Sequence, residues 1–80
     1  MKRQWVLFHL REASSELAAT LREMEEDPEY GFGEFSVGMA HLYHHLNTAW
    51  NSRDTSQERV SLSSDEDFQS WRKFPADLPL

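Results

Sequence analysis

The segment from Phe35 to Arg53 restricts the possible folds of this chain more than any other stretch. Its apolar residues recur at spacings of four, three, four and three: Phe35, Met39, Leu42, Leu46 and Ala49. Because an α-helix turns by about 100° per residue, this spacing places the five side chains in one stripe. The segment therefore predicts a long amphipathic helix whose stripe packs against a partner.

The first third of the chain has the same period and provides that partner. Its apolar residues are Val6, Leu10, Ala13, Leu17, Leu21 and Met24. The pattern stops at Asp27-Pro28, since a residue before proline is pushed out of helical geometry. Two glycines follow in the connector 27–33, whose length suits an antiparallel helical hairpin. This arrangement predicts a seam in which Leu17 lies near Leu42.

The last third predicts shorter elements. Thr55 to Glu58 and Ser63 to Glu66 both have the spacing of a capping box, which marks helix starts. We expect short helices at about 56–62 and 64–74, followed by an extended tail over 75–80 that contains two prolines. Their apolar residues are expected to cover one flank of the hairpin. The covering residues are Val60, Leu62, Phe68 and Trp71, and the covered ones are Leu7, Leu10, Leu21, Tyr43 and Trp50.

The predicted fold class is all-α, within a single domain that spans residues 1–80. An antiparallel two-helix hairpin, with helices at about 4–26 and 34–52, carries a C-terminal segment of one or two short helices packed across one flank. A second core would be too small to be stable in 80 residues. Even one core is marginal, because a chain this short buries only about 60–65% of the surface that its unfolded form exposes. Folding then depends on good helix packing or on a second copy.

Composition argues against several classes of protein. The chain has no cysteine, which excludes disulfides, thiol catalysis and cysteine-bound zinc and fits a cytoplasmic location. The apolar run Trp5–Leu10 is too short for an export signal, and no run approaches the ~20 residues of a membrane span. A net charge of −6 without a basic face argues against nucleic-acid binding. We therefore expect neither nucleic acid nor membrane as a partner.

Four residues form a candidate metal site on one flank of the hairpin. His41 and His45 are four residues apart and share a helix face, and Glu12 and Glu16 have the same spacing on the facing helix. Two imidazoles with one or two carboxylates suit one divalent transition metal. The chain lacks the H-E-x-x-H and Glu-x-x-His signatures. The alternative is that these histidines only hydrogen-bond to glutamates or backbone, with no cofactor.

Catalytic arrangements are less well supported. Ser52, His9 and Glu12 could form a triad, and His45 with Glu16 could form a general base, but no nucleophile elbow or oxyanion loop accompanies them. So short a chain also offers few elements from which to build a pocket. The prediction leans against an enzyme, with no catalytic or cofactor-binding residues assigned. A small metal-dependent hydrolase that uses the same histidines and glutamates is the third hypothesis.

Aromatic residues on the same flank predict an association surface. Trp5 and Phe8 form an apolar patch that the chain has no evident means of covering, and His9 and His44 lie beside it. We therefore expect a non-enzymatic protein-interaction module that self-associates, as a homodimer, or that binds another protein. Metal binding is the alternative function.

Overall fold

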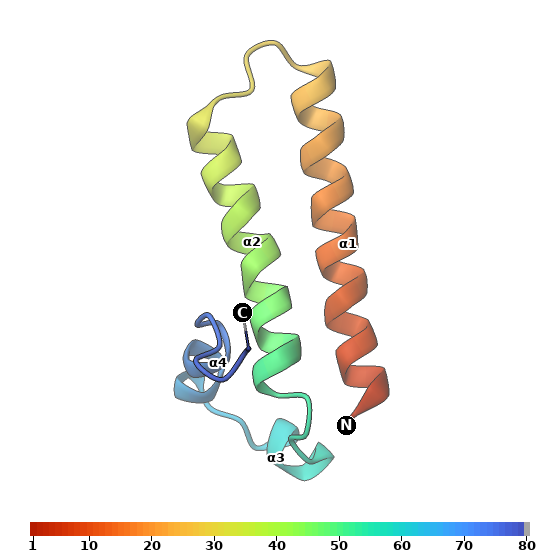
Figure 1. Ribbon diagram of the computed structural model, residues 1–80, viewed down its shortest axis with the longest axis vertical. Helices are drawn as coiled ribbons and strands as arrows, with labels where there is room; N and C mark the ends of the chain where they lie inside the picture. Colours follow the sequence, from red (N-terminus) through yellow and green to blue (C-terminus); the bar gives the residue numbers. More distant parts are fainter. Residues whose placement is uncertain (80) are drawn as a thin grey trace.

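The computed structural model describes residues 1–79, with Gln57 described by its backbone alone, and contains four helices within that range. Helices α1 (Arg3–Glu26) and α2 (Phe32–Asn51) form an antiparallel hairpin, α3 (Gln57–Ser61) lies beyond its open end, and α4 (Asp65–Trp71) packs against α2 (Figure 1). The predicted all-α hairpin with a short C-terminal helix on one flank is confirmed. None of the helices in residues 1–79 is long and apolar enough to cross a bilayer.

Local hydrogen bonds set the turn between α1 and α2. The Asp27 carboxylate accepts a hydrogen bond from the backbone N–H of Glu29 at 2.9 Å. The Glu34 carboxylate accepts another from the N–H of Gly31 at 2.9 Å, at the start of α2. Hydrogen bonds from the backbone N–H groups of Glu34 itself and of Gly31 lower the pKa of this carboxyl group. A charged carboxylate is favourable there because the N-terminus of a helix is electropositive.

The C-terminal segment binds α2 mainly through polar groups. Asn47 donates a hydrogen bond to the carbonyl of Arg72 at 2.7 Å, and Asn51 donates to the carbonyls of Trp71 and Lys73 at 2.8 Å each. These amides satisfy carbonyl groups that a helix end leaves unpaired. Helix α4 accordingly ends at Trp71, before the predicted boundary at residue 74.

The hairpin does not bury the predicted apolar seam. The buried hydrophobic residues are Ala13 and Ala49, and the other buried positions of the hairpin hold small or polar residues: His9, Thr20, Gly38, Asn47, Thr48 and Ser52. Six large members of the predicted seam are exposed, among them Leu17 and Leu46, and the other three are partly buried: Val6, Met39 and Leu42. Two helices touch along one line only, so side chains that flank this line need a second layer to become buried.

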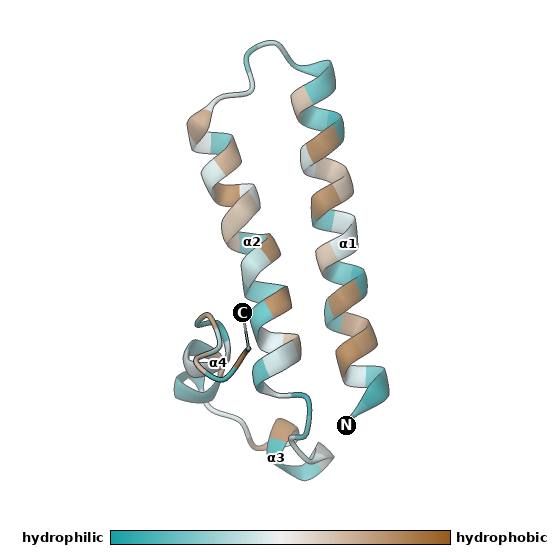
Figure 2. Cartoon of the chain, viewed as in Figure 1, coloured by the Kyte–Doolittle hydropathy of each residue, from teal (hydrophilic) through white to brown (hydrophobic). Residues whose placement is uncertain are grey.

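We call the flanking stripe the apolar face. It consists of Leu10, Leu17, Leu21 and Met24 of α1 with Phe35, Met39, Leu42 and Leu46 of α2. Of these, Met39 and Leu42 are partly buried and the other six are exposed. Hydrophobic bands on α1 and α2 are visible in Figure 2.

The predicted C-terminal cover of Leu10, Leu21 and Tyr43 is wrong, because all three side chains are exposed, as is Leu62, one of the expected covering residues. The physical reason is the position of the asparagines that bind α4. Asn47 lies about 100° around α2 from Leu46, so hydrogen bonds to it draw α4 away from the apolar face.

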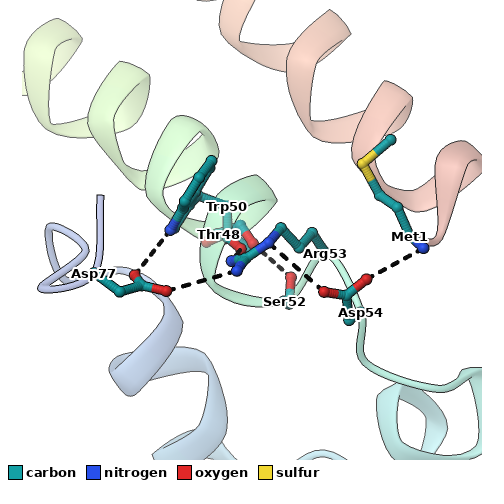
Figure 3. A network of polar contacts seen from close by, with 7 residues as sticks. All are labelled: Met1, Thr48, Trp50, Ser52, Arg53, Asp54 and Asp77. Atoms are coloured by element: carbon teal, nitrogen blue, oxygen red, sulfur yellow. Dashed lines mark hydrogen bonds and ion pairs between the residues drawn. The ribbon is translucent and has the colours of Figure 1, made fainter. Parts of the chain in front are cut away.

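A polar network ties the ends of the chain together at the open end of the hairpin, which we call the base (Figure 3). The α-ammonium of Met1 lies 3.2 Å from Asp54, and the guanidinium of Arg53 lies 3.6 Å from both Asp54 and Asp77. The Trp50 indole N–H donates to Asp77 at 2.9 Å, and this bond is the main reason that the pKa of Asp77 is lowered. The opposite end, with the turn between α1 and α2, is the tip.

Candidate functional site

Three histidines gather between α1 and α2 on the side where Trp5 meets Ser52. We call His9, His44 and His45 the histidine cluster. His9 is 6% exposed, and its Nδ1 lies 3.0 Å from Nδ1 of His45. The ring centroid of His44 lies 4.7 Å from that of His45 and 6.5 Å from that of His9.

The contact between His9 and His45 fixes the roles of the two nitrogens. At 3.0 Å one Nδ1 must donate and the other accept. Nε2 of His9 is buried and has no hydrogen-bond partner within the part of the chain that the structure describes. Placing the proton of His9 on Nδ1 avoids burying an unpaired N–H at Nε2, since such a donor is costly. His9 is therefore assigned as the donor and His45 as the acceptor in this hydrogen bond.

Burial and mutual repulsion disfavour a charge on His9 and His44. The pKa of His9 is lowered from 6.5 to about 4, first by burial and then by the charges that His45 and His44 would carry. The pKa of His44 is also lowered, first by burial and then by His45, Arg72 and His41. His9 and His44 therefore carry little positive charge near neutral pH.

The structure brings some of the predicted metal ligands together. Nδ1 of His41 lies 3.8 Å from Oε2 of Glu16 across the hairpin. His45 turns its Nδ1 to His9, a residue outside the predicted set. Within residues 1–79, no group of three or more histidine, aspartate or glutamate side chains has the geometry to hold a metal ion. A site made of His41, His45, Glu12 and Glu16 stays a prediction.

Ser52 has a structural role in the hairpin. Its hydroxyl is completely buried, accepts a hydrogen bond from the Trp5 indole N–H at 2.7 Å and donates to the Thr48 carbonyl at 2.5 Å. His9 bonds to His45, so the arrangement of Ser52, His9 and Glu12 considered above is not formed.

The predicted interface residues differ in exposure. Phe8 is 51% exposed and stacks on Trp5 at a centroid distance of 6.5 Å. Trp5 is partly buried and held by Ser52, whereas His9 is buried within the chain and has little surface to offer a partner. Trp5 and Phe8 border an open hollow of about 620 Å³ beside the first residues of the chain.

The pairing of His9 with His45 is absent from the sequence-based predictions, although one signal in the sequence pointed to it. Trp5, His9 and Ala13 are spaced by four residues, which puts His9 on the same side of α1 as the buried Ala13. Trp5, and not His9, occupies the position beside Ser52.

The chain has been compared with protein-family models, with curated proteins and with solved structures, and none of them matches it. Two surfaces of the hairpin therefore carry the functional proposals. One is the apolar face, and the other is the opposite side of the helix contact, which carries the histidine cluster.

Acid should destabilise the fold through His9. Its folded pKa is about 4 against 6.5 when unfolded, so the unfolded state binds the proton first as pH falls. The unfolding free energy should decrease by up to about 3 kcal/mol from pH 6.5 to pH 4 and be insensitive to this group above pH 6.5. Urea unfolding at a series of pH values measures this dependence. His9→Phe should flatten the curve, whereas His41→Phe, at an exposed position, should leave it unchanged; equal slopes in all three proteins would contradict the assignment.

Proposed function

We propose that this protein is a non-enzymatic interaction module that self-associates, with two hairpins placing their apolar faces together as a four-helix bundle. The observation that carries the proposal is that the hairpin exposes more large apolar side chains than it buries. Ala13 and Ala49 are the buried hydrophobic residues of the described chain, whereas six large apolar side chains of the hairpin are exposed on one face. Patches of this kind mark association surfaces in soluble proteins.

The energetics favour a second layer. Full burial of a Leu, Met or Phe side chain contributes roughly 1.5–3 kcal/mol to stability. In a monomer, each exposed residue of the apolar face gains only part of this free energy, and burial against a partner would supply the rest. The face covers roughly 30 Å by 20 Å, judged from helix rise and interhelix spacing. Such an area is of the order of the ~800 Å² per partner that stable complexes bury. One hairpin face is therefore large enough to support a dimer.

The proposal moves the contact away from the surface first expected. Trp5 already packs on Phe8 and bonds to Ser52, so it offers less free apolar surface than the leucines do. Phe8 remains exposed and could add a peripheral contact. The apolar face is the larger surface, and a second copy fits it because the same stripe is available on both partners.

Charge substitutions test the surface directly. Leu17→Glu places a carboxylate in the centre of the apolar face, and we expect it to weaken association by at least tenfold, because burying an unpaired charge is costly. Sedimentation equilibrium should give twice the 9.4 kDa chain mass for the wild type and a monomer for Leu17→Glu at tens of micromolar. Ala18→Glu, at the adjacent exposed position, is the matched control and should stay dimeric.

Phe8→Glu distinguishes the two candidate surfaces in the same experiment. If Phe8→Glu dissociates the protein while Leu17→Glu does not, the contact lies on the Trp5 side. A monomeric wild type that is retained by a different protein would support the alternative of a heterologous partner and contradict self-association.

Binding of one divalent transition metal is the second candidate function. Its support is the approach of His41 to Glu16 at 3.8 Å, with His45 on the same side of the hairpin. Small side-chain rotations at these partly exposed positions would be needed to bring a further ligand in. An ion that binds only the folded state would stabilise it, by about 2.7 kcal/mol at one hundred times its Kd.

Metal titration tests this alternative. Melting temperature is followed while zinc, manganese, cobalt or nickel is added, and metal binding predicts a rise of several degrees with at least one ion. The double variant His41→Ala/His45→Ala should lose that rise. No shift with any ion, or an equal shift in the double variant, would remove the metal hypothesis.

A further inference from the structure

The two ends of the hairpin differ strongly in charge. Between residues 22 and 34 the tip carries six carboxylates and one arginine: Glu23, Glu25, Glu26, Asp27, Glu29 and Glu34 with Arg22. At the base lie the α-ammonium of Met1, Arg3 and Arg53, with Asp54 and Asp77 beside them. Arg3 is seven residues before Leu10, so it continues the stripe of the apolar face toward the base.

The two ends also differ in shape. A groove of about 250 Å³ lies at the base of the apolar face, where Val6 and Leu10 of α1 meet Leu46 and Ala49 of α2. Its floor is formed in part by Ala49, which is buried. Toward the tip the face instead carries larger side chains, and Met24 is 52% exposed. The apolar face therefore has a groove at the base and large exposed side chains toward the tip.

Two-fold symmetry allows two ways of stacking such faces. If the axis runs along the helices, tip lies beside tip and two strongly acidic segments approach each other. If the axis is perpendicular to the helices, the tip of each copy lies over the base of the other. Like charges in contact disfavour the first arrangement, and opposite charges favour the second.

We propose that two copies of this chain pair in the antiparallel orientation. The acidic tip of each copy then lies over the base of the other, where Arg3, Arg53 and the α-ammonium of Met1 carry positive charge. This inference rests on the proposed self-association and names its geometry. Met24 and Phe35 of one copy then lie over the groove of the other, and Arg3 and Arg53 lie near the partner's acidic turn. In the same arrangement α1 packs against α1 of the second copy.

Distances between spin labels test the orientation. The chain has no cysteine, so Ser36→Cys near the tip and Gln4→Cys near the base each give a single label at an exposed, uncharged position. Three samples are measured by pulsed dipolar spectroscopy: each variant alone and an equimolar mixture. With Met24 over the groove, antiparallel pairing predicts separations of about 20 Å for Ser36–Ser36 and about 35–40 Å for Gln4–Gln4, from 1.5 Å of rise per residue along the helices and about 10 Å between the two layers. The mixture should add a Ser36–Gln4 distance of about 17 Å, which is shorter than both.

The order of the three distances distinguishes the two orientations, because the same label adds a similar length to each of them. A Ser36–Gln4 distance longer than both same-site distances would show tip beside tip and overturn the orientation while leaving self-association intact. Nearly equal values for all three would indicate crossed hairpins and also overturn it. Absence of dipolar coupling in every sample would mean that the chain is monomeric, and the proposed function would fail together with this inference.

Discussion

Close contact between α1 and α2 through small side chains is the constraint on which the rest of the structure depends. At Gly38 a Cβ atom would lie only 2.8 Å from Oγ1 of the buried Thr20, so a larger residue there would force the Thr20 side chain or the helices to shift. Ala13 and Ala49 continue the contact toward the base. Because small residues occupy the line of contact, the large apolar side chains lie beside it, on one flank.

The other flank and the C-terminal segment follow from the same geometry. His9 is drawn into the contact beside His45, where desolvation keeps it neutral. Asn47 and Asn51 face away from the apolar side and bind the carbonyls at the end of α4. Helix α4 is thus held by directional hydrogen bonds, which fix its position without covering the leucines. The apolar face that the chain leaves open is the basis of the proposed pairing with a second copy.

Much of this fold could be predicted from the sequence, because helix period and turn chemistry are local. The spacing from Val6 to Met24, the break at Asp27-Pro28 and the stripe from Phe35 place α1 and α2 to within about two residues of their observed bounds. The rotation of each helix about its own axis, which decides which side chains face the partner helix, could not be predicted from this spacing. Leu17 lies only about 40° around α1 from Ala13, so both fit one apolar stripe, and the approach of the partner helix decides which is buried.

The candidate site shows the same limit. Spacing and antiparallel register predicted that Glu12 and Glu16 face His41 and His45, and the structure places Glu16 3.8 Å from His41. The contact of His9 with His45 depends on the burial of His9 between α1 and α2. The hydrophobic pattern does not predict this burial, because histidine is counted as a polar residue. The packing of a short C-terminal helix on one flank was predicted correctly, but the residues that hold it were not. Apolar residues were expected to make the contact, whereas two asparagine amides bind the end of α4.

The central claim is that a second copy completes the core of this protein. It is tested most directly by the melting temperature, followed by circular dichroism over protein concentrations from about 1 to 100 μM. Folding coupled to association makes this temperature depend on concentration. The account predicts a rise of several degrees across the range. A melting temperature that stays constant, together with a monomeric mass at the highest concentration, would contradict it.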